Sequence, residues 1–226
     1  MSLSGRRNKR AKNRFMLERL DDIDWSKLHH AYGEAIDVPD LIRSLLSNDK
    51  KVREDAMYEL CGNIWHQGTV YEASSYAVPF LQELLKSPDT PDKVSIAALL
   101  ADMAIGYGVY DNILGNSQKI KGMTYEEMWR EILAKKGKVL EDEVAKGKKN
   151  AEATRLAVEK ELHLLYPYLL HDEPYVRAII AHSLANFSKY SHEILPLLEK
   201  ALTLDSDEDT RETIVNAINI LRESTQ

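Results

Sequence analysis

A motif that recurs three times along the chain constrains the fold more than any other feature of the sequence. In each copy, a leucine lies six positions before a valine or threonine, and an arginine comes next. The copies are Leu46, Val52 and Arg53; Leu170, Val176 and Arg177; and Leu204, Thr210 and Arg211. Small or apolar residues follow each arginine at three, four and seven positions, which is the spacing of one buried helical face. The motif therefore predicts an equivalent helix in three units of an internal repeat.

Prolines beside apolar residues mark the helix that comes first in a unit. They are Pro39, Pro79 and Pro196. A proline early in a helix fixes φ at little cost, whereas one in the middle bends the helix. We expect Asp37 to be the N-cap of the helix that contains Pro39. Pro79 lies about ten residues into its predicted helix, so we expect a bend there.

The distances between copies indicate the architecture. Arg177 and Arg211 are 34 residues apart, and the nearest match to Arg53 in the second unit lies 41 or 42 residues on, at Val94 or Ser95. Periods of this length, with a helical hairpin in each unit, are typical of a solenoid. The sequence therefore predicts an all-α chain of about four stacked helical hairpins.

An insertion at about 106–150 separates the second unit from the third. We expect it to be irregular over 106–117 and helical over 125–148, with breaks at Gly137 and Gly147. It either packs as an extra hairpin or bridges the two pairs of units. No segment sustains the alternation of a strand, so no strand is expected. The other expected helices lie near 15–30 and at 38–47, 50–66, 70–86, 91–105, 151–170, 173–188, 191–204 and 207–223.

The order of proline, paired leucines, aspartate, valine and arginine, followed by small residues, resembles HEAT repeats. The likeness is to the short bacterial kind that also occurs in phycobilin lyases. Residues 62–73 and 77–81 look like a group of uncharacterised bacterial HEAT-repeat proteins. The resemblance covers roughly residues 20–105 and 150–224. It implies an α-α superhelix, and it carries no catalytic residue that could be transferred to this chain.

Charge is distributed unevenly along the chain. The first fourteen residues carry six basic side chains and no acidic one, which leaves 24 basic against 36 acidic residues. Residues 15–226 therefore carry a formal charge of about −12, and a body this acidic repels phosphate backbones. We expect residues 1–14 to be a solvated basic arm, with contact to an anionic surface as the alternative. We expect residues 15–226 to form a single HEAT-like repeat domain.

Apolar runs and cysteine usage bear on the compartment. No apolar run approaches the roughly 20 residues that cross a bilayer. The basic N-terminus lacks the apolar stretch of a secretory signal. The single cysteine, Cys61, lies in an apolar helical pattern and is expected to be a buried residue in a reducing compartment. The sequence therefore predicts a cytoplasmic protein without a membrane partner, and it leaves the oligomeric state open.

The recurring arginines have a structural role that the resemblance implies. In HEAT-like repeats, this arginine commonly contacts an aspartate of the same or the next repeat. Three aspartates are suitably placed near the three arginines. The expected structural ladder consists of Arg53, Arg177 and Arg211 with Asp49, Asp172 and Asp207.

The resemblance also indicates where a partner would bind, because second helices line the concave side of such solenoids. Exposed aromatic and amphipathic side chains on these helices are the candidates, since such residues are enriched at binding hot spots. Trp25 and Tyr32, near the N-terminal end, are further candidates. The main candidates are Tyr58, Glu59, Trp65, His66, Tyr71, Tyr175 and His182.

The segment from Trp65 to Glu72 has both a functional and a structural interpretation. Its imidazole, amide, carboxylate and aromatic groups could form a site at the turn between two hairpins. Structurally, Gly68 suits the left-handed residue just after a helix, and His66 suits the last helical turn. Thr69 and Glu72 have the spacing of a capping box for the next helix. The structural interpretation is favoured.

Catalytic and metal chemistry find little support. No two histidines have the spacing of a shared helical face, and one cysteine cannot support a zinc cluster. Nothing near Cys61 in the sequence would activate the thiol. Gly106 and Gly108 lack the lysine and spacing of a P-loop. HEAT-repeat hydroxylases hold iron through several His-Glu pairs, and this chain has one, His192–Glu193. The acidic clusters read as helix caps: Asp21 and Asp22, and Asp205, Asp207 and Asp209. No metal and no cofactor are predicted.

These observations favour a non-catalytic scaffold or adaptor whose partner is a protein with a basic patch. The resemblance adds toxin immunity or regulation as biological settings. Two alternatives remain open. A HEAT-like alkylpurine DNA glycosylase would need a basic concave groove with aromatic residues and an aspartate. A bilin lyase or chaperone-like binder would need an aromatic-lined cleft wide enough for a tetrapyrrole.

Overall fold

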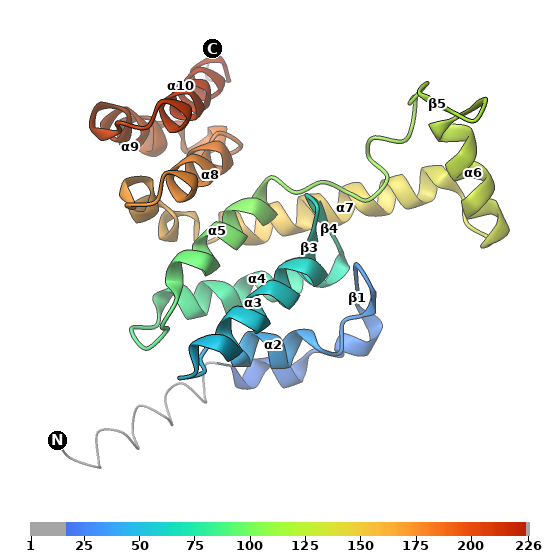
Figure 1. Ribbon diagram of the computed structural model, residues 1–226, viewed down its shortest axis with the longest axis horizontal. Helices are drawn as coiled ribbons and strands as arrows, with labels where there is room; N and C mark the ends of the chain where they lie inside the picture. The colour runs from blue at the N-terminus through green and yellow to red at the C-terminus, as the bar shows by residue number, and fades with distance from the viewer. Residues whose placement is uncertain (1–16, 225–226) are drawn as a thin grey trace.

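The computed structural model describes residues 17–224, and helices form most of this part of the chain (Figure 1). The all-α prediction is confirmed. The predicted arm, residues 1–14, lies outside the described residues. The α-helices are α2 Val38–Ser44, α3 Lys50–Ile64, α4 Glu72–Lys86, α5 Lys93–Ala104, α6 Tyr125–Lys135, α7 Leu140–Glu159, α8 Pro174–Leu184, α9 Ser191–Leu204 and α10 Glu208–Glu223.

Short 3-10 turns and two-residue strands connect these helices. The 3-10 turns are η1 Glu18–Asp22, η2 Trp25–Lys27, η3 Leu162–Leu164, η4 Tyr166–Leu170 and η5 Ser188–Tyr190. Three antiparallel hairpins are present: β1 His29–His30 with β2 Gly33–Glu34, β3 Trp65–His66 with β4 Thr69–Val70, and β5 Lys119–Ile120 with β6 Met123–Thr124. The expectation of no strands is therefore wrong. The helix expected near 15–30 is replaced by η1, η2 and β1.

The helices form hairpins that stack on one another. Helix α2 packs against α3, α4 against α5, η4 against α8, and α9 against α10. Successive hairpins also touch, because α5 contacts α8 and α8 contacts α10. Figure 1 shows the hairpins following one another from the N-terminal to the C-terminal end of the molecule. Pro79 lies inside α4 and Pro196 inside α9, so both helices are continuous through a proline.

The insertion differs from the prediction in the position of its second helix. Helix α6 ends at Lys135, and Gly137 adopts a left-handed φ of 70° at the expected break. Helix α7 then runs through Gly147 without a break and ends at Glu159, inside the range predicted for the third unit. It packs against both α4 and α5. The insertion thus bridges units, and the first half of the third unit is built from the end of α7 with η3 and η4.

Gly147 has a packing reason for its place inside a helix. The backbone of Gly108, in the loop after α5, lies directly against it. A Cβ atom on Gly108 would lie 2.4 Å from the carbonyl carbon of Gly147, and one on Gly147 would lie 3.0 Å from the Cα atom of Gly108. Two glycines therefore allow the loop to cross α7 in backbone contact.

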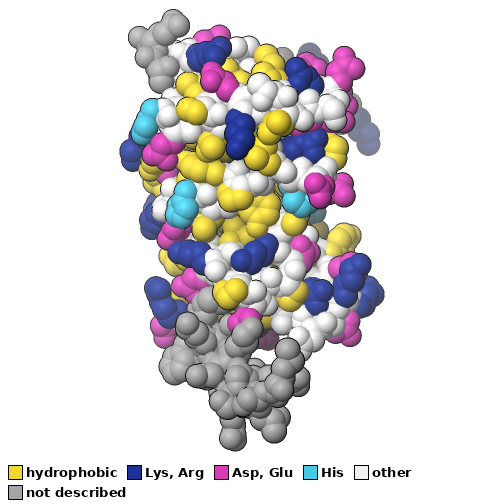
Figure 2. All heavy atoms as spheres, turned by 90° about the vertical axis from the view of Figure 1, so that its left-hand side faces the viewer, with side chains coloured by type: hydrophobic (Ala, Val, Ile, Leu, Met, Phe, Trp, Pro, Cys, Tyr) yellow, Lys and Arg dark blue, Asp and Glu magenta, His cyan; other side chains and the backbone are white. Residues whose placement is uncertain are grey.

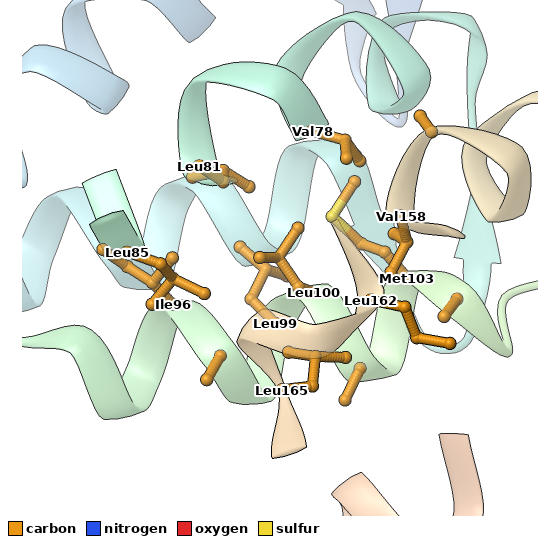
Figure 3. Close-up of a cluster of buried hydrophobic side chains, with 14 of the residues drawn as sticks. Val78, Leu81, Leu85, Ile96, Leu99, Leu100, Met103, Val158, Leu162 and Leu165 are labelled. Atoms are coloured by element: carbon orange, nitrogen blue, oxygen red, sulfur yellow. The ribbon is translucent and has the colours of Figure 1, made fainter. Parts of the chain in front are cut away.

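One continuous hydrophobic core runs from Leu17 to Leu221. Its central part lies between α4, α5 and the end of α7, as Figure 3 shows. Leu81, Leu100 and Val158 meet there, and each is almost completely buried. Each such side chain contributes roughly 1.5–3 kcal/mol of hydrophobic stabilisation. A separate small cluster of Ile113, Leu133, Leu140 and Val144 holds α6 against α7.

The three motif arginines make one shared contact. Each Nη1 donates to the backbone carbonyl six positions earlier: Arg53 to Ser47 at 2.8 Å, Arg177 to His171 at 2.8 Å and Arg211 to Asp205 at 2.9 Å. The three sequence copies thus form the same local structure, a tie between a second helix and the loop before it. The second unit has no such arginine. Its equivalent position, four residues after the N-cap Asp92, is Ile96, which is fully buried.

The aspartates of the expected ladder have other roles. The carboxylates of Asp49 and Asp207 cap α3 and α10, accepting from the amides of Lys51 and Thr210. Asp172 offers its backbone carbonyl to Arg177. The carboxylate that Arg177 binds belongs to Asp205 of the next unit, with Nε and Nη2 at 2.6 and 2.7 Å from its oxygens. The ladder therefore consists of arginine–carbonyl contacts with one ion pair between units. Asp205 follows the end of α9, and the N-cap of α10 is Asp207.

Candidate functional site

A pocket of about 350 Å³ lies where the end of α3 meets the β1–β2 hairpin. Four of the predicted binding residues come together here with Tyr32, which the sequence suggested as an additional candidate. Tyr58 is 82% exposed and Tyr32 is 70% exposed. The pocket is lined by Tyr32, Tyr58, Glu59, Cys61, Gly62, Asn63, Trp65, His66 and Gln67.

The end of α3 and the β3–β4 hairpin supply one side of the pocket. Helix α3 ends at Ile64, and the chain turns back at Gln67 and Gly68, with φ of 50° and 89°. Two positive φ values are typical of a type I′ hairpin turn. The left-handed conformation predicted for Gly68 is confirmed, although it closes a β-hairpin rather than a helix. His66 accordingly lies in β3 and not in a last helical turn.

The predicted capping box of Thr69 and Glu72 is wrong. Tyr71 occupies the N-cap of α4, and its backbone amide donates to Ser74 Oγ at 2.8 Å. The Thr69 hydroxyl donates instead to the carbonyl of His66 at 2.6 Å. Thr69 therefore stabilises the hairpin that carries the pocket residues.

The β1–β2 hairpin supplies the other side of the pocket through Tyr32. The Tyr32 hydroxyl lies 3.2 Å from Nδ1 of His66, and the two rings meet edge to face with centroids 5.4 Å apart. This contact joins two segments that are 34 residues apart in the chain. An edge-to-face pair of this kind contributes about 0.5–1.5 kcal/mol beyond its buried area.

Asp37 anchors this hairpin to α3. Its carboxylate accepts from Nδ2 of Asn63 at 2.6 Å and lies 3.0 Å from Nε2 of the buried His30. The amide of Tyr32 donates to Nδ1 of His30, so the imidazole proton is on Nε2 and points to Asp37. Asp37 occupies the predicted N-cap position of α2, but no side-chain capping bond is present there. Its carboxylate holds Tyr32 in place.

The charge of the pocket is that of one carboxylate. No lysine or arginine lines it, and Glu59 has no ion-pair partner among residues 17–224. The indole nitrogen of Trp65 is buried without a hydrogen-bond partner in this part of the chain. A buried donor left unpaired costs about 1–3 kcal/mol, so Trp65 is not held here by hydrogen bonding.

Beside the pocket, three second helices bring Cys61, Asp102 and Tyr175 close together. Burial raises the pKa of Asp102 to about 6, and the nearby Tyr175 hydroxyl partly offsets this. Burial, reinforced by the charge of Asp102, raises the pKa of Cys61 to about 11. The thiol is therefore protonated at neutral pH, which makes it a poor nucleophile. Asp102 was not predicted, because α5 reads as an apolar helix in which one acid gives no distinct signal.

The remaining candidates lie outside the pocket. Tyr175, 64% exposed, and His182 lie two turns apart on one face of α8. Trp25 is buried, and its indole nitrogen donates to the carbonyl of Leu20, so it is not a surface residue. Tyr71 lines a second pocket of about 460 Å³ between α4, α7 and the loop after α5.

The charges of that second pocket are largely matched within the chain. Lys146 and His29 both approach Glu72, at 3.7 and 3.8 Å, and Lys138 lies 3.1 Å from Glu143. A third pocket, of about 520 Å³, surrounds the Arg177–Asp205 ion pair between η4, α8 and α9. In the second pocket these charged groups pair with one another. The third pocket also contains the carboxylates of Asp172 and Asp207, which form no ion pair among the described residues.

Over residues 17–224, no group of three or more histidine, cysteine, aspartate or glutamate side chains is arranged to hold a metal ion. None of the helices in this range has the length and apolar character required to cross a membrane. No family model, curated protein or solved structure matches the chain.

Proposed function

We propose that this chain is a non-catalytic protein-binding scaffold of the HEAT-like kind, with the second helices of its hairpins as the binding face. Two observations support the HEAT-like interpretation. The hairpins stack in sequence order, and three of them share the arginine contact to the carbonyl six residues earlier. The unusual insertion, with α7 across α4 and α5, is an addition to such a stack.

The observation that carries the functional proposal is the clustering of aromatic side chains at this face, of which Tyr32, Tyr58 and Tyr175 are exposed and Trp65 is partly buried. Tyr32, Tyr58 and Trp65 gather around one pocket, and Tyr175 lies beside it with Asp102. Exposed tyrosines and tryptophans next to a concave surface are typical of protein-binding hot spots. Among the described residues, no base is hydrogen-bonded to the Cys61 thiol, and its raised pKa makes it a poor nucleophile.

The charge of the second helices supports a protein partner over a nucleic acid. Helices α3, α5, α8 and α10 together carry eight acidic and seven basic side chains. Acidic and basic side chains are also interspersed on the face of the molecule in Figure 2, around a band of hydrophobic side chains. A DNA-binding enzyme needs a continuous basic surface. We further propose a cytoplasmic adaptor or immunity role, which rests on the resemblance to HEAT-repeat proteins.

Site-specific photo-crosslinking in the native cell tests this function. A benzophenone amino acid replaces Tyr58 or Tyr175 on second helices and, as a matched control, the exposed Tyr76 on α4. We expect one protein to be crosslinked from positions 58 and 175 and not from position 76. Crosslinking from position 76 alone would place the interface elsewhere, and release of alkylated bases from DNA by the purified protein would favour the glycosylase alternative.

A further inference from the structure

We propose that the pocket formed by Tyr32, Tyr58, Glu59, Trp65 and His66 binds an arginine side chain of the partner protein. This inference rests on the proposed protein-binding function and specifies the chemistry that the partner presents.

The first argument is charge. Glu59 brings a full negative charge to the pocket, and no described residue neutralises it. Other acids on α3 are already paired, Glu54 with Lys50 at 3.3 Å and Asp55 with Lys51. A cation entering here meets the Glu59 carboxylate and no lysine or arginine of residues 17–224, which is the complementarity that steers and fixes a charged group.

The second argument is the aromatic lining. Tyr32, Tyr58 and Trp65 surround a volume of about 350 Å³. Tryptophan and tyrosine rings attract cations through the negative charge of their faces, by about 0.5–2 kcal/mol per contact. An anionic ligand would be disfavoured by the ring faces and by Glu59, whereas an apolar ligand would leave Glu59 without a partner. A cation satisfies both features at once.

Hydrogen-bonding capacity favours guanidinium over ammonium. The Glu59 carboxylate, the Tyr58 hydroxyl and the Gln67 side chain line the pocket and accept no hydrogen bond from the described residues. A guanidinium has five donors in a plane, stacks on aromatic rings and loses less hydration than an ammonium. Acceptors spread around an aromatic pocket therefore suit arginine better than lysine.

The test is a nuclear magnetic resonance titration of the ¹⁵N-labelled protein with N-acetyl-arginine methylamide. We expect shifts at Gly62, Asn63 and the Trp65 indole, with a Kd on the order of 1–10 mM for so small a ligand. The lysine analogue should bind more weakly. The citrulline analogue has nearly the same shape without the charge, and it should not bind. Equal binding of citrulline, or shifts that map to another surface, would overturn the proposal.

Two variants make the test specific. Glu59→Gln should weaken arginine binding about fivefold, the equivalent of about 1 kcal/mol. Glu54→Gln, on the same helix but already paired with Lys50, should leave it unchanged. Gly62→Leu should abolish binding without unfolding the protein, because a Cβ atom at Gly62 meets nothing within 4 Å and leucine favours the helix. A folded Gly62→Leu protein that still binds arginine would contradict the site.

The two proposals can fail separately. If arginine binds as expected and position 58 crosslinks no protein, the pocket assignment holds and the scaffold function fails. If a partner is crosslinked from position 58 but neither arginine nor an arginine-containing peptide of that partner shifts the pocket residues, the scaffold function holds and the arginine assignment is wrong.

Discussion

The buried carboxyl of Asp102 makes the stability of the protein depend on pH. Burial raises the pKa of its carboxyl from 3.8 to about 6, so the folded protein keeps a proton that the unfolded chain releases. The free energy of unfolding therefore falls as pH rises from about 4 through 6. We expect Asp102→Asn to stabilise the protein at pH 7.5 by roughly 1 kcal/mol, allowing for solvent screening, and to have no such effect below pH 4. Urea unfolding across this pH range measures the free energy of unfolding of the wild-type and Asp102→Asn proteins. A stabilisation by Asp102→Asn that is independent of pH would argue against titration of Asp102.

The pKa of Asp205 is shifted in the opposite direction to that of Asp102, so its effect on stability has the opposite dependence on pH. Its side chain is 1% exposed, and the Arg177 guanidinium holds the pKa of the carboxyl below its ordinary value. The stability that this pair contributes is therefore present above about pH 4 and is lost as pH falls further. We expect Asp205→Asn to cost about 3 kcal/mol at pH 7, because it removes the carboxylate that pairs with the largely buried Arg177. The control is Asp209→Asn, at an exposed position of α10. Thermal unfolding at pH 7 and pH 3 measures the stability that Asp205→Asn loses, and this loss should be smaller at pH 3.

These residues also show what sequence could predict at this scale. The spacing of the motif correctly predicts that the three arginines are equivalent, because each arginine bonds to a carbonyl of its own unit. The resemblance to HEAT repeats suggested Asp172 as the partner of Arg177, whereas the carboxylate comes from Asp205, 28 residues further on. The choice between two nearby aspartates depends on how units pack, and no local pattern records that.

Among the elements, the crossing of α7 by the loop after α5 depends on two glycines. A methyl group on Gly147 would press on the Gly108 backbone, so we expect Gly147→Ala to destabilise the protein by about 1–3 kcal/mol, although alanine favours helices. Gly62→Ala is the matched control. It lies in α3 with open space around its Cβ, and should stabilise by up to about 1 kcal/mol. Chemical denaturation measures the change in the free energy of unfolding, which should be a loss for Gly147→Ala and a gain for Gly62→Ala. A stabilised Gly147→Ala protein would contradict the backbone contact between Gly108 and Gly147.

The short hairpins were missed because two-residue strands are too short to show alternation. Their turns do leave a signal. Gln67–Gly68 and Lys121–Gly122 both place glycine second in a two-residue loop, and all four residues have positive φ. This is the chemistry of type I′ turns. Four predicted pocket residues lie within the nine positions from Tyr58 to His66, so one helix and one hairpin bring them together. Tyr32 and Asp102 come from other elements and required the tertiary structure.

For the whole molecule, the sequence predicts the hairpins and the presence of an insertion, but not the course of that insertion. The range predicted for the first helix of the last unit matches α9, because Pro196 marks its N-terminal half and the motif leucine Leu204 marks its end. The insertion has no repeat to set its boundaries. The sequence therefore predicts a break at Gly147 and a longer, separate first helix for the third unit. In the structure, α7 continues through Gly147.

A stack of hairpins should lose stability locally when one contact between units is broken. In such a stack each unit contacts its neighbours, so stability is close to a sum of unit and interface contributions. Asp205→Asn removes the ion pair that ties the last loop to α8. We expect faster amide hydrogen exchange in α8, α9 and α10, with a smaller effect in α5 and none in α2 and α3. Mass-spectrometric hydrogen exchange of wild-type and variant proteins measures this gradient. Equal acceleration in all helices would mean that the continuous core unfolds as one cooperative unit, and the HEAT-like interpretation would lose its thermodynamic support.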